Sequence, residues 1–268
     1  MIRTVVTALL LMAVAATGRA GAATANLTVQ LVHQSAVTRT DGTWDSTAST
    51  GTTDAQLTVS PIPNGSTAIV ALLYESCYNP PSQPGCVSAG GNLDIIKVGS
   101  QTATWLGSYA NARYTGDGLG ITVAWVNNVQ GNPTTIDMIS TSGGIWYDGA
   151  IVSIFSGIPS SATVDGVNGG AFASGGPMGA CCGDGILTSP SVTPTQSGDF
   201  LYGVAVSYGC GPPDAGSGWT GSNFSTNYFG KTDEWQVYNS TSPIGATFPT
   251  SCGGGTSSYA ATVAVKLQ

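Results

Sequence analysis

The chain has 268 residues, of which 38 are glycine and only 8% are charged, and its formal net charge is −7. Fourteen acidic residues against seven basic ones argue against nucleic acid or an anionic membrane as partner, since both require clustered cations. The hydrophobic fraction of 41% is too high for a disordered chain, and the length suits one large β-sandwich or two small domains.

The N-terminus has the order of a secretory signal peptide. Arg3 precedes an apolar run over residues 5–16, and small residues follow up to an A-x-A cleavage site at residues 23–25. This run is far shorter than the ~20 residues that a spanning helix needs. We therefore predict a signal peptide over 1–25, a single β-sandwich domain over 26–268, and a secreted or cell-surface protein with no membrane span in its mature chain. The alternative is that this N-terminal segment is an uncleaved membrane anchor.

The even number of cysteines predicts disulfide bonds in an exported chain. They are Cys77, Cys86, Cys181, Cys182, Cys210 and Cys252. A short bridge between Cys77 and Cys86 would close a proline-rich loop, and Cys210 could pair with Cys252, since both end apolar runs. The two adjacent cysteines are then left for a vicinal bridge, or for exchange with the others. A zinc site is disfavoured because the chain has no C-x-x-C spacing and a single histidine.

Beyond the signal peptide, short apolar runs bounded by Gly, Pro, Asn and Asp predict strands and almost no helix. The run over residues 68–74 is continuously apolar, as expected of a strand that is buried on both faces. Residues 167–185 are rich in Gly, Ala and Ser, and we interpret them as a linker or a long functional loop. The expected strands cover residues 27–33, 55–59, 68–74, 93–98, 102–106, 119–126, 134–139, 146–155, 186–192, 200–208, 223–230, 233–238, 244–248 and 259–267.

Two segments of the chain share one pattern. Residues 59–74 and 192–208 both begin with Val, then Ser or Thr, then Pro, and both place a glycine six residues after the Val. An apolar run follows, and a cysteine lies eighteen residues after each starting Val. The later apolar blocks also keep the same order. The pattern predicts an internal duplication, with pseudo-repeats at about 55–158 and 186–268, although a glycine-rich β protein can show such matches by coincidence.

Two related sets of four or five strands suit a jelly-roll-like, two-sheet β-sandwich, whose two Greek keys leave few open edges. The expected fold class is therefore all-β, of this jelly-roll-like type, built from the duplication and braced by disulfides. Two separate small domains are the alternative, and they are disfavoured because residues 167–185 are neither strongly polar nor proline-rich.

Four stretches carry a resemblance to known proteins: FSGIPSSATVDG (155–166), TSPSVTPTQSGDFLYGVAV (188–206), GSGWT (216–220) and YAATVAVK (259–266). Together they resemble a β-sandwich module of secreted and cell-surface bacterial proteins, many of them uncharacterised. The resemblance covers roughly the C-terminal 120 residues well and the N-terminal half loosely. It implies a fold and an extracellular setting, and it carries no catalytic residues. The adjacent cysteines in residues 167–185 are not part of its pattern.

The sequence gives little support for catalysis. The only histidine, His33, lies in an alternating strand pattern, and no G-x-S-x-G elbow occurs in a strand–turn–helix setting. Glycoside hydrolysis needs two carboxylates on either side of a sugar. The chain has two glutamates, Glu75 and Glu234, which we expect at solvated strand ends. We therefore predict no catalytic residues and, on balance, no enzyme.

Binding without catalysis is better supported. Aromatic residues near loop boundaries can stack on the apolar face of a sugar ring, and neighbouring Asp or Asn side chains can complete the hydrogen bonds. The alternative for most of these aromatic residues is the core. Calcium is a weaker option, from the turns at 41–45 and 115–118, and no other cofactor is expected. The candidate ligand-binding residues are Trp44, Trp146, Tyr147, Asp148 and Trp219.

These observations together favour a non-catalytic extracellular binding module or surface-structural module. Its expected partners are a polysaccharide or other copies of the same chain. Two alternatives stay open: a carbohydrate-active enzyme of β-sandwich fold, and a subunit of an extracellular filament or matrix.

Overall fold

The computed structural model describes residues 28–38, 53–76, 95–110, 118–139, 146–165, 172–174, 185–208, 214–225, 229–250 and 258–267. All regular structure in these residues is β-strand, so the expected all-β class is confirmed. Several features of the sequence analysis lie outside these ranges, namely the signal peptide, all six cysteines, Trp44, and the acidic residues of the two turns considered for calcium.

The first half of the chain forms nine strands in the described residues. They are β1 (Gln30–Thr38), β2 (Thr53–Thr58), β3 (Thr67–Ser76), β4 (Ile95–Val98), β5 (Gln101–Thr102), β6 (Thr104–Ala110), β7 (Gly118–Val126), β8 (Thr135–Ile139) and β9 (Trp146–Ser156). The second half adds β10 (Thr163–Val164), β11 (Phe172–Ser174), β12 (Gly185–Thr188), β13 (Asp199–Tyr208), β14 (Thr220–Ser225), β15 (Phe229–Tyr238), β16 (Thr247–Thr250) and β17 (Ser258–Lys266).

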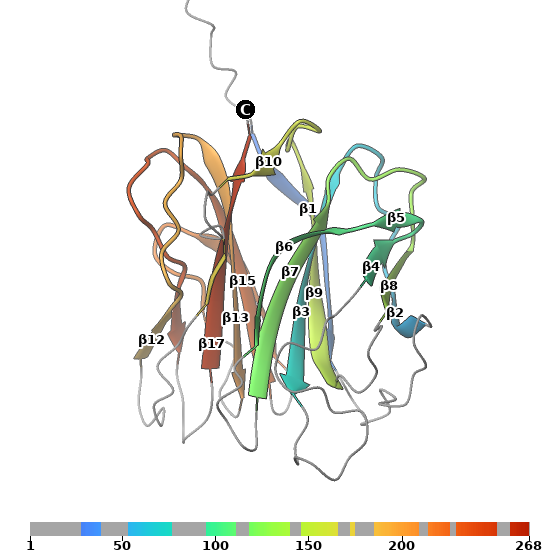
Figure 1. Ribbon diagram of the computed structural model, residues 1–268, viewed down its shortest axis with the longest axis horizontal. Coiled ribbons are helices and arrows are strands. Elements are labelled where there is room, and N and C mark those ends of the chain that lie inside the picture. The colour runs from blue at the N-terminus through green and yellow to red at the C-terminus, as the bar shows by residue number, and fades with distance from the viewer. Residues whose placement is uncertain are drawn as a thin grey trace, which may run out of the picture.

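The strands form four antiparallel sheets in the described residues, where the sequence had suggested two. The first central sheet has the order β1-β9-β3-β7-β6, and the second has β10-β17-β13-β15-β14 with β11 also on β17. The first outer sheet is β2-β8-β4-β5, and the second is β12-β16. Figure 1 shows the sheets as successive layers, with the central sheets face to face and an outer sheet against the far side of each.

The strands of each half pair in a nested order. In the first half β1 pairs with β9, β2 with β8, β3 with β7 and β4 with β5, and alternate pairs belong to alternate sheets. In the second half β10 and β11 pair with β17, β12 with β16, and β13 with β15. Each half therefore encloses its own core, and the two halves meet through their central sheets.

Burial on both faces of the central strands explains the extra sheets. Residues 68–72 of β3 are all 0% exposed. Ile69 and Ala71 belong to the cluster between the central sheets, whereas Ala68, Val70 and Leu72 pack towards the first outer sheet. A strand in a two-sheet sandwich buries one face and alternates with polar residues, so a continuously apolar strand needs a layer on each side.

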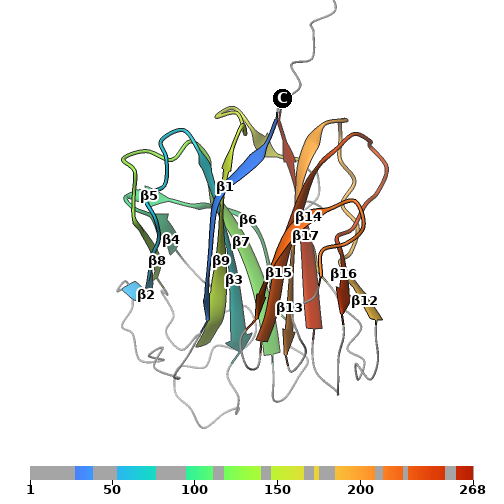
Figure 2. The ribbon, with the colours of Figure 1, turned by 180° about the vertical axis from the view of Figure 1, so that it is seen from behind.

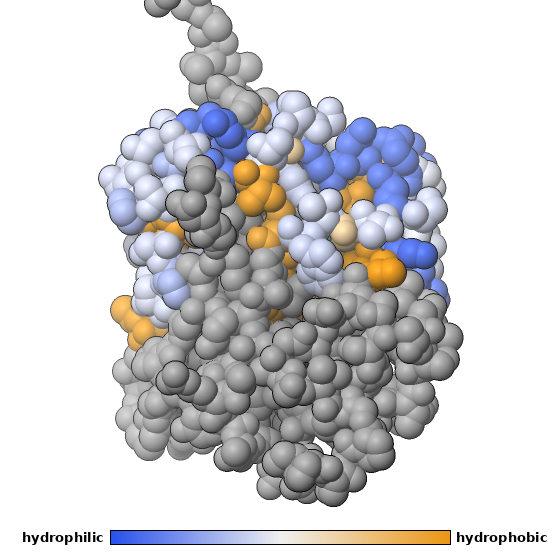
Figure 3. Space-filling view, in the orientation of Figure 1, coloured by the Kyte–Doolittle hydropathy of each residue, from blue (hydrophilic) through white to orange (hydrophobic). Residues whose placement is uncertain are grey.

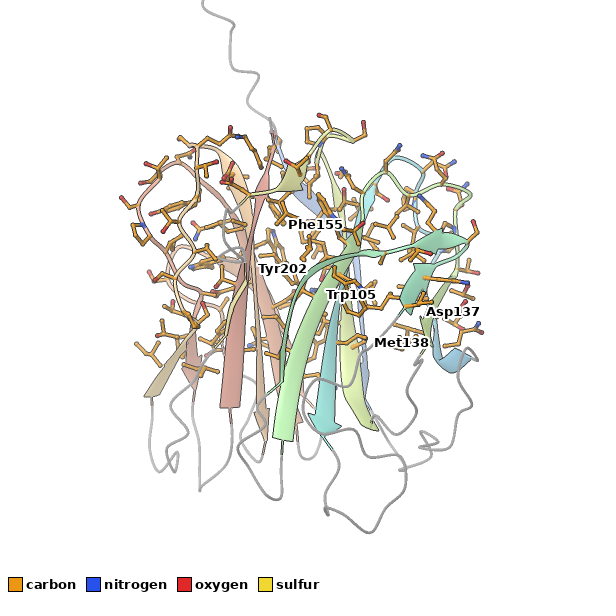
Figure 4. The ribbon with its side chains drawn as sticks, viewed as in Figure 1. Trp105, Asp137, Met138, Phe155 and Tyr202 are labelled. Atoms are coloured by element: carbon orange, nitrogen blue, oxygen red, sulfur yellow. The ribbon has the colours of Figure 1, made fainter. Side chains whose placement is uncertain are left out.

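Aromatic rings fill the space between the two central sheets. The Phe155 ring meets the rings of Phe200, Trp235 and Tyr202 edge-on, with centroid distances of 5.0, 5.4 and 6.4 Å. Figure 4 shows Phe155 and Tyr202 between these sheets, and Met138 and Trp105 between the first central and first outer sheets. Such edge-to-face contacts stabilise the docking of the halves beyond the area they bury.

The two matching sequence segments occupy equivalent places. Gly65 and Gly198 both have positive φ, 78° and 94°, just before β3 and β13. The Gly65 N–H donates to the carbonyl of Val129 after β7, and the Gly198 N–H donates to that of Tyr238 at the end of β15, each at 2.8 Å. This correspondence is what a duplicated sequence would produce, and the duplication itself stays a prediction.

The paired glycines give a matched test of this equivalence. A Cβ built on Gly65 or Gly198 meets no atom within 4 Å, so an alanine there adds backbone strain without a clash. We expect Gly65→Ala and Gly198→Ala each to lower the free energy of unfolding by about 1 kcal/mol, measured by urea denaturation. A clear loss from one variant and none from the other would contradict the structural equivalence of the two turns.

The hairpin of β14 and β15 differs from its expected boundaries. The sequence suggested strands over 223–230 and 233–238, but β15 runs without interruption through Lys231, Asp233 and Glu234. All three side chains are 0% exposed. The expectation that Glu234 lies at a solvated strand end is therefore wrong, because charged residues in this strand are buried by the layers on both sides.

Candidate functional site

A pocket of about 370 Å³ opens where the two halves meet near β10. We call it the junction pocket. Three segments line it: the β5–β6 region, the end of β7, and the connection from β9 into β10. Its lining residues are Gln101, Thr102, Thr104, Trp125, Val126, Asn127, Ser160, Ala162, Thr163 and Val164. In Figure 3 the face that carries β6 and β10 shows a hydrophobic strip between the halves, bordered by more polar residues.

Two amide side chains of the pocket are held in fixed orientations. The Gln101 Oε1 accepts a hydrogen bond from the backbone N–H of Gln130 at 2.7 Å. The Asn127 Nδ2 donates to the Pro159 carbonyl at 2.8 Å, and its Oδ1 accepts from the Thr67 hydroxyl at 2.8 Å. Asn127 therefore ties the ends of β3 and β7 to the connecting segment. Side chains that are already ordered lose little entropy when a ligand binds.

Trp125 forms the floor of the pocket. It is only 6% exposed and belongs to the core cluster between the central sheets. It therefore offers limited apolar surface and cannot act as an open stacking platform. Exposed hydroxyls surround it from Thr102, Thr104, Ser160 and Thr163. Thr104 and Trp125 are register partners in β6 and β7, which places them side by side on one face.

A largely buried polar network joins the two halves. The Gln34 Nε2 donates to both carboxylate oxygens of Asp233, at 2.7 and 2.6 Å. The Ser153 and Tyr202 hydroxyls donate to Oδ2 at 2.6 and 3.0 Å. Figure 2 shows β1 and β15, which carry Gln34 and Asp233, on the same side of the molecule. Burial raises the pKa of Asp233 to about 6, although hydrogen bonds from Ser153, Gln34 and Tyr202 oppose the rise.

Glu234 fixes the second outer sheet. Its Oε2 accepts from the backbone N–H of Gly216 at 2.6 Å, and its Oε1 accepts from that of Thr247 at 3.0 Å. Burial raises the pKa of Glu234 to about 7, against the effect of these two donors. Both oxygens are occupied and the side chain is 0% exposed, so a substrate cannot reach this carboxyl group.

The ligand-binding residues that the sequence suggested are only partly described by the structure, and their role stays a prediction. Trp146, Tyr147 and Asp148 begin β9, and their side chains lie outside the description, as Trp44 does entirely. Trp219 is half-buried and packs against the core clusters of the second half. Trp146 is nine residues from Phe155 along β9, or roughly 30 Å. Trp219 precedes Thr220, the register partner of Trp235, which contacts Phe155.

Trp146 and Trp219 therefore lie near opposite ends of the central strands, and the described lining of the junction pocket contains none of the five suggested residues. The pocket residues could not be predicted from aromatic rings at loop boundaries, because the pocket is lined mainly by hydroxyl and amide side chains. The signals that could have found them are the alternating threonines at 102 and 104 and the polar stretch that follows β7.

Comparison with known proteins adds no relative, since no family model, curated protein or solved structure matches the chain. Among the described residues there is no helix long and apolar enough to cross a membrane. The same residues contain no group of three or more His, Cys, Asp or Glu side chains that could hold a metal ion.

Proposed function

We propose that this protein is a secreted, non-catalytic extracellular binding module that holds a neutral sugar in the junction pocket. The observation that carries the proposal is the lining itself: all ten described residues around the pocket are uncharged, and most are hydroxyl or amide side chains. Ordered amides and hydroxyls are the groups that pair with sugar hydroxyls, and the pocket volume lies at the low end of the range typical of small-ligand sites.

The uncharged lining also favours one class of sugar. An acidic sugar would lose its hydration in the pocket without gaining a cationic partner, which is costly. A neutral sugar can exchange its water hydrogen bonds for those of Thr104, Gln101 and Asn127. We therefore expect the preferred ligand to be a neutral polysaccharide or its terminal residue.

We further infer that each half is a jelly roll braced by disulfides. The nested pairs β1–β9, β2–β8, β3–β7 and β4–β5, which alternate between two sheets, support the topology. The second half repeats the order with fewer strands. In support of a bridge in the second half, Gly185 and Thr250 are register partners, and Cys182 and Cys252 lie only three and two residues from them in sequence.

Retention on immobilised polysaccharides tests the binding proposal. We expect the protein to be retained on at least one neutral polysaccharide, from a panel of xylan, mannan and β-glucan, and not on alginate or polygalacturonate. Removing two hydroxyls in Thr102→Ala/Thr104→Ala should weaken binding about thirtyfold, at about 1 kcal/mol per hydrogen bond. Thr104→Trp should abolish binding by filling the pocket.

Thr58→Ala, on the exposed face of β2, is the matched control and should bind like the unmodified protein. The proposal is wrong if no neutral polysaccharide retains the protein. It is equally wrong if Thr104→Trp binds as well as Thr58→Ala does. Unfolding temperatures of all variants show whether a loss of binding reflects a loss of fold.

The enzyme alternative loses its main candidate. Of the two glutamates, Glu234 is fully buried with both oxygens bonded to backbone amides. The raised pKa of Glu234 follows from its burial in the folded structure. The side chain of Glu75 lies outside the described part of the chain. A two-carboxylate mechanism that uses the two glutamates therefore has no support in the described residues.

A further inference from the structure

The segment that walls the junction pocket is fixed at both ends. Asn127 binds the Pro159 carbonyl at its start. At its end, directly after pocket residues Thr163 and Val164, the backbone N–H of Asp165 donates to the Ala264 carbonyl at 3.0 Å. We call residues 160–165 the wall segment. The Asp165 side chain makes further contacts at this end of the segment.

The Asp165 carboxylate is held by the chain that leads into β13. It accepts hydrogen bonds from the backbone N–H and the hydroxyl of Thr195, at 2.5 and 2.6 Å. Asp165 is 4% exposed, and the carboxyl group of Asp199, which is 0% exposed, lies beside it. Two neighbouring carboxyl groups that are both buried are most stable when one of them keeps its proton.

The surroundings of Asp199 place that proton on it. Neither of its oxygens meets a donor at full hydrogen-bond geometry, although the Gln196 amide lies close. Burial raises the pKa of Asp199 to about 7, and the neighbouring Asp165 adds to the rise, whereas Lys266 on β17 opposes it. Burial alone would raise the pKa of Asp165 too, but hydrogen bonds from Asp199 and Thr195 lower it. Asp199 is therefore the acid of the pair and Asp165 the carboxylate.

We propose that the proton shared by Asp165 and Asp199 controls ligand binding at the junction pocket. With the proton present, the Asp199 hydroxyl donates to Asp165 and the wall segment stays closed against the second half. When the proton leaves for solvent, two negative charges face each other in a buried site, with Lys266 as the cation beside them. The wall segment then separates and the pocket loses one side. This regulation rests on the proposed function, because it acts on the same pocket.

Hydrogen exchange of the wall segment in the unmodified protein tests the proposal without any ligand. After correction for intrinsic rates, we expect the backbone amides of residues 160–165 to exchange about tenfold faster at pH 8.5 than at pH 5.5. Asp199→Asn should remove this change, since its amide can donate to Asp165 at every pH. Asp214→Asn, an exposed acid elsewhere in the second half, is the control and should keep the change.

Binding measured on the same samples separates the two proposals. Affinity for the retained neutral polysaccharide should fall about tenfold between pH 5.5 and 8.5 in the unmodified protein and stay constant in Asp199→Asn. If exchange changes with pH but no polysaccharide binds, the proposed function fails and the proton control of the wall segment stands. Equal exchange rates at both pH values in the unmodified protein would overturn the proposal that the shared proton controls the wall segment. This holds even if Asp199→Asn does not fold. Recovery of slow exchange on addition of Ca²⁺ at pH 8.5 would also overturn it, in favour of a cation between the carboxylates.

Discussion

Asp233→Ala should lower the free energy of unfolding at pH 7 by about 3 to 5 kcal/mol, because it leaves buried donors without an acceptor. The Gln34 amide and the Ser153 hydroxyl both donate to this carboxylate from the first half, and the Tyr202 hydroxyl donates from the second. The lost hydrogen bonds are ones that hold the two halves together. Urea denaturation should show it, together with a fall in unfolding temperature of roughly 10 °C.

Two variants make the result specific to the network. Asp233→Asn keeps one carbonyl acceptor and should cost less than the alanine variant. Asp137→Ala removes an acid from β8 that accepts a hydrogen bond from the Gln56 amide at the exposed surface, and it should change stability by no more than about 0.5 kcal/mol. If Asp233→Ala is no more destabilised than Asp137→Ala, the network does not hold the halves together.

The central strands could be predicted from the sequence because their apolar runs are long and continuous. Residues 68–74 and 200–208 lie within β3 and β13, as predicted. The turn glycines before these strands belong to the shared pattern in which a glycine follows the starting Val by six residues. The number of layers could not be predicted with the same ease. A continuous apolar run indicates burial on two faces, but it does not say whether the second face is covered by the same half or the other one.

Charged residues inside β15 show where prediction from the sequence fails. Lys231, Asp233 and Glu234 would be read as exposed in any local window, and their burial depends on partners far away in the chain. Gln34 is 199 positions from Asp233 in sequence. The junction pocket is likewise formed by segments that are distant in sequence, since its walls come from β5–β6, β7 and the segment before β10. Local sequence carries no information about such a meeting of distant segments.

The protein should become less stable as the pH rises from about 4 to about 7. Burial raises the pKa of Asp199 and Glu234 to about 7 and that of Asp233 to about 6, from ordinary values of 3.8, 4.5 and 3.8. Each group binds its proton more tightly in the folded state. Its contribution to stability is therefore complete below the unfolded pKa and is lost as the pH rises to the folded pKa.

The expected fall in the free energy of unfolding follows from about 1.4 kcal/mol for each group and each unit by which its pKa is raised. Because a buried site relaxes and takes up some water when its carboxyl groups ionise, we expect less than the full sum, a fall in the free energy of unfolding of about 3 kcal/mol between pH 5 and 7.5. The unfolding temperature should fall by roughly 6 to 12 °C, measured by calorimetry at constant ionic strength. Asp165, whose pKa is lowered from 3.8, acts in the opposite sense but only below that pH.

Substitution identifies the groups responsible for the slope. Asp233→Asn and Glu234→Gln cannot titrate, so each should flatten the pH dependence, and the double variant should flatten it further. Asp214→Asn, which replaces an exposed carboxyl group, should leave the slope unchanged. An unfolding temperature that stays constant or rises from pH 5 to 7.5 would mean that these carboxyl groups are better solvated or better bonded than the structure indicates. The proton shared by Asp165 and Asp199 would then lose its physical basis as well, because the same burial raises the pKa of Asp199.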